Sequence, residues 1–480
     1  MRAEEPGPTS SEQGGQPAGG WDLGASRRFV ALAAARGASQ VLGIVWFLLA
    51  VRRLDESTFG DLAAGLAFFA VFSGIGDAGT TRTVVRHVAT NHDLVWSAYW
   101  RALPLRIMTG LTVGALTTAA VAVAPVPVPA QVVLLAGLLA TVSGATELAF
   151  ASRRAIGAIW VEVGLLVGER VVFLAAGVVA LSAGVGAIGI LVLYLVTNLF
   201  SAVISGLATW WKRPRHHTQP GPMTDREARL TAYGFALVTI SPRLPTILVA
   251  LLTSPVDLAT FSVAQRPVEA IALFALSTAT PALPIARNRL SRGLVADADR
   301  AVAAVAGVLL LALAPAVAWF LVAPDIPLSL LAGAGRYESA KPVLQILALT
   351  TASWVFRGVA ELRLLAEERA GLLVRVTLSG AITTVIAGAP FVIAFGSIGA
   401  AWAVVAGEAI MTILLARSLP ALADRSALRS YFPATGVFVA TAVVLAATAD
   451  HVALQTALLG VAFGVAAITA LRLLKHLERR

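Results

Sequence analysis

The 480-residue sequence contains no cysteine, which excludes disulfide bonds, thiolate chemistry and cysteine-based metal sites. Charged residues are also scarce, since they make up 13% of the chain, about half the share that is usual in soluble proteins. Apolar residues make up 58%, more than a water-soluble core can bury. Apolar stretches of about 18 to 25 residues recur along the chain, each long enough to cross a hydrocarbon core of about 30 Å as a helix. The composition therefore predicts a polytopic helical membrane protein.

Recognisable catalytic motifs are absent as well. The sequence has no HExxH, no P-loop and no GxSxG, so hydrolytic and ATP-driven functions have no support. The adjacent His216 and His217 lie in a polar segment and are interpreted as a solvated surface pair, not a metal site. We therefore expect no enzyme, and neither a cofactor nor a metal.

The predicted fold is all-α, with fourteen transmembrane helices arranged as two six-helix lobes around a central cavity plus a C-terminal helix pair. Charge and proline interrupt the seventh and tenth spans, and the thirteenth is short. The predicted spans are 29–50, 58–77, 107–124, 130–150, 157–181, 186–210, 234–252, 257–283, 302–322, 340–360, 371–394, 397–417, 434–449 and 452–471.

Basic residues predict the orientation of these spans, because short cytoplasmic loops collect Lys and Arg. With alternating loops, 28 of the 37 basic residues fall on the side of both termini and only four on the other, namely Arg52, Arg53, Arg336 and Lys341. We therefore expect both termini in the cytoplasm. A basic cytoplasmic face against anionic lipid headgroups also accounts for the net charge of +10, so no nucleic-acid partner is expected.

The polar segments predict five regions. Residues 1–27, rich in Gly, Pro, Ser, Glu and Gln, have the composition of a disordered cytoplasmic tail, and 212–232 that of a cytoplasmic linker. The linker separates an N-terminal lobe, 28–211, from a C-terminal lobe, 233–418. Residues 419–480 hold the additional helix pair and a basic cytoplasmic tail. A weak internal similarity between GVGAIGILVLYLVTNLFSAV and FGSIGAAWAVVAGEAIMTIL supports the two halves, as is common in transporters.

Three stretches resemble one known family. ASQVLGIVWFLLAVRRLDESTFGDLAAGLAFFAVFSGIGDAG, DLATFSVAQR and GSIGAAWAVVAGE resemble the bacterial polysaccharide-biosynthesis flippases, which are O-antigen and capsule exporters of the multidrug/oligosaccharidyl-lipid/polysaccharide superfamily. The resemblance covers roughly residues 28 to 420. The residues that carry its first motif are Arg53, Leu54, Phe59, Gly60, Asp77 and Gly79.

The resemblance implies a function. It implies alternating-access translocation of a polyprenyl-diphosphate-linked oligosaccharide, a polysaccharide precursor, across the bacterial cytoplasmic (inner) membrane through a cationic cavity between two lobes. The implied partners are the lipid-linked glycan, membrane lipids and other polysaccharide-assembly proteins. Related peptidoglycan-precursor flippases usually carry an Arg–Asp pair in the first helix, where this chain reads VLGIVWFLLA without a charge, which argues against that substrate.

Charged residues inside spans are candidates for the transport site, because a charge at the bilayer centre costs about 2.5–3.5 kcal/mol on insertion scales. Arg243 lies eight or nine residues from each end of its span, at about 1.5 Å per residue, and Pro242 and Pro245 flank it. We predict that it faces a hydrated cavity and binds phosphate, with an interhelix ion pair as the alternative. The predicted substrate-binding set is Arg243, Arg36, Arg53, Arg266 and Arg357.

The same-helix spacings leave a structural interpretation open for two of these arginines. Arg266 and Glu269 are three apart, and Arg357 and Glu361 four apart, so each pair can meet on one face. Asp77, near a glycine-rich helix end, is interpreted as a cap or turn residue.

Intramembrane carboxylates are candidates for carrying a coupling proton or sodium ion. Glu162, Glu169 and Glu147 form this predicted set, and partnership with an arginine is an equally supported alternative. Two other functions stay open at this point: an ion-coupled small-molecule exporter of the multidrug type, and a membrane polysaccharide polymerase or glycosyltransferase. The shortness of the predicted outer segments counts against the enzymes, and the deep arginines count against export of cationic compounds.

Overall fold

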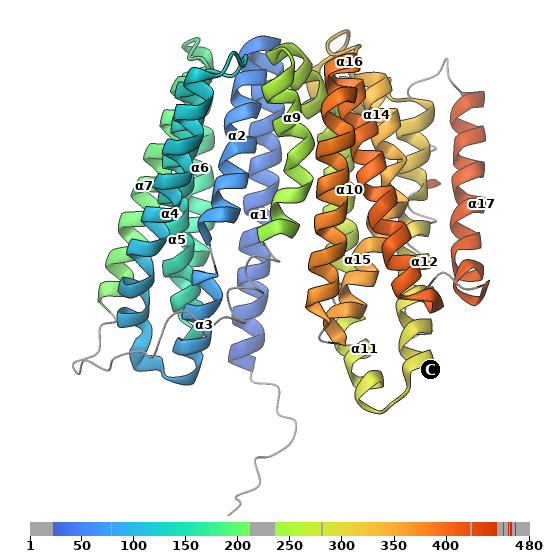
Figure 1. Ribbon diagram of the computed structural model, residues 1–480, viewed down its shortest axis with the longest axis horizontal. Coiled ribbons are helices and arrows are strands. Elements are labelled where there is room, and N and C mark those ends of the chain that lie inside the picture. Colours follow the sequence, from blue (N-terminus) through green and yellow to red (C-terminus); the bar gives the residue numbers. More distant parts are fainter. Residues whose placement is uncertain are drawn as a thin grey trace, which may run out of the picture.

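The computed structural model describes residues 23–77, 79–211, 236–279, 282–367, 369–422 and 425–448, together with single residues between 455 and 466. Helices dominate these residues, and no strand occurs among them. The long helices stand side by side (Figure 1). The predicted all-α membrane fold is therefore confirmed. The predicted linker at 212–232, nearly all of the predicted 1–27 tail and most of the span at 452–471 lie outside the described residues.

The first bundle contains the helices that precede residue 211. Its centre is α5, which contacts α2, α4 and α7, while α6 contacts α1 and α7. The helices are α1 (Leu23–Arg53), α2 (Glu56–Asp77), α3 (Thr80–Thr90), η1 (His92–Leu94), α4 (Val95–Val123), α5 (Ala130–Ala155), α6 (Trp160–Ser182) and α7 (Ala187–Trp210).

The second bundle contains the helices from residue 241 onward. Here α16 contacts α9, α14 and α15, α10 contacts α14 and α15, and α17 contacts α12 at the edge of the molecule (Figure 1). The helices are η2 (Ser241–Arg243), α9 (Leu244–Leu252), α10 (Pro255–Ala279), α11 (Ala282–Ser291), α12 (Val295–Val322), α13 (Asp325–Ala332), α14 (Ala340–Ala348), α15 (Thr350–Ala366), α16 (Ala370–Ser418), η3 (Pro420–Leu422) and α17 (Arg425–Ala447).

Nine helices of the described residues are long and apolar enough to cross a membrane, compared with fourteen predicted spans. Local causes account for much of the difference. Two predicted spans form one continuous element, α16, with a kink at Gly396, where φ is 55° and ψ is −130°. The segments Ala236–Leu252 and Pro433–Ala447 are apolar but short, and α10 carries Asp257, Arg266 and Glu269. The number fourteen stays a prediction.

Several boundaries differ from those predicted from apolar runs. The first helix starts at Leu23, inside the segment expected to be a disordered tail. α4 starts at Val95, twelve positions before the predicted start at 107, because Arg106 is buried against Asp77 and does not end the helix. The polar segments around residues 80–90 and 282–291 also form short helices, α3 and α11, whose charged side chains kept them out of a search for apolar spans.

Small residues let the helices approach closely. A Cβ on Gly114 of α4 would lie 3.0 Å from the Cα of Gly137 of α5, so these two backbones touch. A Cβ on Gly60 of α2 would lie only 1.9 Å from the carbonyl oxygen of Pro255, the first residue of α10. Such glycine contacts are typical of membrane helices, which gain little from the hydrophobic effect between them.

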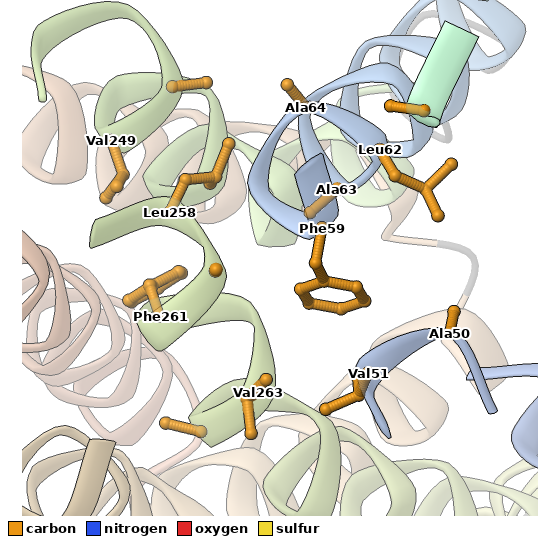
Figure 2. Packing of buried hydrophobic residues seen from close by; sticks show 14 of the residues in the cluster. Ala50, Val51, Phe59, Leu62, Ala63, Ala64, Val249, Leu258, Phe261 and Val263 are labelled. Atoms are coloured by element: carbon orange, nitrogen blue, oxygen red, sulfur yellow. The ribbon is translucent and has the colours of Figure 1, made fainter. Parts of the chain in front are cut away.

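The two bundles meet along α1 and α2 of the first and α9, α10 and α13 of the second. Figure 2 shows part of this contact, with Val51 of the first bundle beside Val263 of α10 and Phe59 of α2 nearby. Buried residues of both bundles therefore form one continuous hydrophobic cluster. We call the face that holds α3, α11 and most basic residues the basic face, and the face that holds the α1–α2 turn and α13 the opposite face.

The turn between α1 and α2 is fixed by its own polar groups. Asp55 accepts hydrogen bonds from the backbone N–H of Thr58 (3.0 Å) and from the hydroxyl of Ser57 (2.5 Å), as an N-cap does. These bonds lower the pKa of Asp55 to about 2. The carboxylate therefore stays charged at neutral pH and holds the first turn of α2 on the opposite face.

Candidate functional site

The helix that carries Arg243 is interrupted where the sequence places two prolines. Ser241–Arg243 forms one turn of 3₁₀ helix, and α9 begins directly after it with Pro245 in its first turn. Proline is tolerated at these positions because the first N–H groups of a helix lack an intrahelical partner. The break directs Arg243 toward α10.

Arg243 lies in an ion-pair cluster with two residues of α10. Its Nη1 donates to Oε1 of Glu269 (2.5 Å), and Nη1 of Arg266 donates to Oε2 of the same carboxylate (3.0 Å). The predicted Arg266–Glu269 pair is thus present. The charge on Arg243 is not isolated, because it has the interhelix partner that was the alternative interpretation.

This cluster lies at the boundary between the bundles. The guanidinium of Arg266 lies 4.8 Å from the ring centroid of Phe47, on α1 of the first bundle. Its side chain is nevertheless 39% exposed, so space remains beside it at the boundary. Two arginines against one carboxylate leave one net positive charge. Each guanidinium has five N–H donors, of which the bonds to Glu269 use one, so donors remain for an anionic ligand.

A second cluster joins Arg36 of α1 to three residues of α5 and α6. Glu162 is 2% exposed, and its Oε1 accepts from Arg36 (3.2 Å) and from Arg154 (3.2 Å), while Arg154 also pairs with Glu147. Oε2 of Glu162 is buried without a hydrogen-bond partner in the described part of the chain. The predicted residues Arg36, Glu162 and Glu147 therefore come together, with Arg154, which the prediction did not include.

A third group lies inside the second bundle. Arg357 of α15 forms an ion pair with Glu408 of α16 at 3.4 Å. Glu361, the same-helix partner that the spacing suggested, also interacts electrostatically with Arg357. Glu408 lines a cavity of about 20 Å³, enough for roughly one water molecule, with Ser241, Gln265 and Thr384. Oε2 of Glu408 is buried without a hydrogen-bond partner among the described residues. The sequence signal for Glu408 was that this charged residue lies inside an apolar span.

Two predicted residues lie apart from these clusters. Arg53 is exposed at the last residue of α1, on the opposite face. Glu169 is half-buried on α6, two turns from Glu162. Its neighbour Arg170 lies 5.4 Å from the ring centroid of Tyr194 on α7. No contact of Arg53 or Glu169 tests the roles predicted for them.

Asp77 acts at the junction of α2 and α3. It accepts from the hydroxyl of Thr81 (2.5 Å) and forms an ion pair with Arg106, which also donates to Thr80 (3.2 Å). Gly79 takes a φ of 78° there, a conformation that favours glycine. These contacts match the interpretation of Asp77 as a turn residue.

Comparison with protein families gives the identity of the chain. Residues 26–286, more than half of the sequence, match the family model described as polysaccharide biosynthesis protein. The chain belongs to this family. The matched residues include Arg36, Glu162, Arg243 and Arg266 of this polysaccharide-biosynthesis protein, while the pair between Arg357 and Glu408 lies beyond them.

Solved structures with the same fold are membrane transporters. A lipid II flippase MurJ in an inward closed conformation superposes with a TM-score of 0.63 at 11% identity, over 94% of this chain and 99% of that one. An inward-facing multidrug resistance transporter of the MATE family superposes with a TM-score of 0.59 at 12% identity, over 86% and 98%. These identities show a shared fold and nothing finer. No curated protein matches the sequence.

Proposed function

We propose that this family member translocates a polyprenyl-diphosphate-linked oligosaccharide across the bacterial cytoplasmic membrane by alternating access, and that it has no enzymatic activity. The observation that carries the proposal is the cluster of Arg243, Arg266 and Glu269 at the boundary of the bundles. It holds one net positive charge and donors not used by Glu269. Guanidinium groups suit phosphate because their planar fork can donate two parallel hydrogen bonds.

The surroundings of the cluster support a ligand that enters between the bundles. Arg266 contacts Phe47 across the boundary and remains partly exposed, as a residue on a transport path would be. Arg36, 53% exposed on α1, would offer a second positive charge nearer the basic face, and Arg53 and Arg357 complete the proposed substrate-binding set. A diphosphate would compete with Glu269 for the two guanidinium groups and so release one ion pair while forming another.

The orientation follows from the charges. We propose that the basic face is cytoplasmic, with both termini on that side, because short cytoplasmic loops collect Lys and Arg. The lipid-linked glycan would then enter from the cytoplasmic leaflet, where anionic lipids contact the basic face. We also propose the division into lobes at 28–211 and 233–418, and partnership with other polysaccharide-assembly proteins.

Ion coupling is proposed for Glu162, which is buried, for Glu147, which pairs with Arg154, and for Glu169, which lies two turns from Glu162 on α6. Glu408 joins them because its Oε2, like that of Glu162, lacks a described partner. In reconstituted vesicles, replacing the coupling glutamate by Gln should make the transport rate with an ion gradient equal to the rate without one. The exposed Glu338, exchanged for Gln, is the control. Gradient-dependent transport in every one of these variants would overturn the assignment.

The substrate role of Arg243 is tested in a deletion strain that carries each variant, with surface glycan and membrane protein measured together. Arg243→Ala should lose most surface glycan at normal protein level, since one charge-assisted contact corresponds to roughly ten- to 150-fold in binding. Arg243→Lys should retain part, because Lys keeps the charge without the fork. Arg300→Ala, at an exposed arginine that also pairs with a carboxylate, is the matched control and should have no effect.

Normal surface glycan from a well-expressed Arg243→Ala protein would remove the residue from the mechanism. Normal glycan in the deletion strain itself, with increased sensitivity to cationic compounds, would favour a small-molecule exporter.

A further inference from the structure

Two of the few basic residues on the opposite face cross from one bundle to the other. Of the four that oppose the overall charge distribution, Lys341 pairs within the second bundle, with Asp325 and Glu338. Arg52 and Arg336 instead reach the other bundle, over a sequence separation of about 280 residues. That two of only four basic residues on this face bind the other bundle calls for a physical reason.

Arg336 binds the end of α1. Its Nη1 donates to the carbonyl oxygens of Val51 (2.9 Å) and Arg52 (2.9 Å), and its Nη2 donates to that of Leu54 (2.8 Å). The last four carbonyls of a helix lack intrahelical partners and carry the negative end of the helix dipole. A guanidinium at this place therefore satisfies acceptors that the helix itself leaves open.

Arg52 makes the converse contact. From the end of α1 its Nη2 donates to the carbonyl oxygen of Leu330 (2.6 Å) and its Nε to that of Leu331 (3.2 Å), both in the last turn of α13. Each arginine thus binds the C-terminal turn of a helix in the opposite bundle. The arrangement is reciprocal, and its acceptors are backbone carbonyls, which do not titrate.

Apolar contacts lie directly beneath these bonds. The ring of Tyr337, next to Arg336 in the chain and 3% exposed, lies edge-on to Phe59 of α2, with centroids 6.5 Å apart. Tyr337 has a φ of 57°, which is uncommon for a residue with a Cβ. One residue further along α2, Gly60 lies against the backbone of Pro255. The two arginines therefore lie beside a close, buried contact between the bundles.

We infer that Arg52 and Arg336 form a reciprocal gate that holds the bundles together on the opposite face and must open once in each transport cycle. The inference rests on the proposed alternating-access function and adds its gating residues. Such a gate suits reversible opening, because guanidinium groups and carbonyls that separate at the protein surface regain hydrogen bonds from water. If the two arginines had only a structural role, the same bonds would stay formed throughout the transport cycle.

The gate is tested by distance measurements that need no transported substrate. The chain has no cysteine, so two introduced cysteines carry the only spin labels. Ser182, at the end of α6, and Val256, at the start of α10, are exposed positions in opposite bundles. Double electron–electron resonance on the purified protein in nanodiscs then reports their separation in the wild-type background and in each variant.

The combined Arg52→Gln and Arg336→Gln exchange should add a longer-distance population, with a ratio of open to closed molecules increased on the order of tenfold. The combined exchange of both arginines to Lys should give an open-to-closed ratio between those of the wild type and the double Gln variant, because Lys keeps the charge but lacks the planar fork of donors. Lys341→Gln removes the same charge from the same face without a bond between bundles and should match the wild type. Distances equal to the wild type in the folded double Gln variant would overturn the gate.

If the double variant does not fold, the single variants Arg52→Gln and Arg336→Gln are measured instead. Each should shift part of the molecules to the longer distance. A lowered melting temperature with unchanged distances would assign the arginines a structural role only. None of these outcomes depends on which molecule is transported. Failure of the gate is therefore distinguishable from failure of the proposed function, which the surface-glycan measurement tests.

Discussion

A single carboxylate, Glu269, holds two arginines that come from different helices. The cost of removing a residue from such a cluster depends on what is left unpaired. Without Arg243, Glu269 still has Arg266 at 3.0 Å, so no charge is stranded. Without Glu269, two guanidinium groups lie beside each other with no shared acceptor. The cluster is therefore asymmetric, and its arginines can be probed individually without much damage to the fold.

We expect Glu269→Gln to destabilise the protein more than Arg243→Ala does. The loss should be roughly 1–3 kcal/mol for Glu269→Gln, and smaller for Arg243→Ala because the remaining pair is intact. Apparent melting temperatures of the purified variants in detergent give the order. Equal melting temperatures for the two variants would contradict the shared-carboxylate arrangement. Adding Arg243→Ala to Glu269→Gln should recover part of the loss, because it removes one of the two stranded charges.

Helices of this protein are placed by small residues as much as by large ones. Phe59 and Gly60 belong to the first motif of the family resemblance, and the structure gives both a physical role, since they form the contact of α2 with Tyr337 and Pro255. In the second bundle, Gly396 permits the kink of α16 and lies against Asp257, so that a Cβ would be 3.1 Å from its Oδ1. Two motif segments far apart in sequence are thus brought together at one helix end.

Gly60→Ala should separate α2 from α10. The added Cβ would lie 1.9 Å from a backbone oxygen that cannot rotate away, so we expect a loss of about 1–3 kcal/mol in stability. Gly43→Ala in α1 is the matched control, because no atom lies within 4 Å of its Cβ position. It should be neutral or stabilise by up to about 1 kcal/mol. Thermal unfolding of the two variants side by side checks the difference. A Gly60→Ala protein as stable as the wild type would contradict this account of the contact.

The whole molecule has an uneven charge distribution between its two faces. Arg363 is buried near the basic face and pairs with Asp299 (2.7 Å) and Glu367 (2.8 Å), while Arg52 and Arg336 on the opposite face bind backbone carbonyls. Lys341, also on the opposite face, pairs with the carboxylates of Asp325 and Glu338. The unequal number of basic residues on the two faces is consistent with a single fixed orientation in the membrane.

Cysteine labelling in intact cells tests that orientation. Single cysteines at Ser57 and Ser182, both exposed on the opposite face, should react with a membrane-impermeant maleimide, and those at Asn91 and Ser291, exposed on the basic face, should react only after permeabilisation. The absence of native cysteine keeps the background low. Labelling of Asn91 or Ser291 in intact cells would reverse the proposed topology.

The sequence by itself determined that the protein lies in a lipid bilayer, that its fold is all-α, and which family it resembles. Apolar composition and the recurrence of long apolar runs require a bilayer, and local motifs such as the one that includes Phe59 and Gly60 carry the family resemblance, because these properties depend on residues close together in the chain. The sequence also determined which charges are costly, since a charge inside an apolar run stands out without any knowledge of its neighbours.

The tertiary structure alone decided which charges meet. Arg243 and Glu269 are 26 positions apart, and Arg336 and Arg52 are 284 apart. Helix periodicity relates residues three or four positions apart, so it could find the Arg266–Glu269 pair but not Glu408, the ion-pair partner of Arg357 on another helix. The acceptors of Arg52 and Arg336 are backbone carbonyls, which every residue has. No pattern of side chains could therefore have predicted those bonds, and only the docking of α1 against α13 creates them.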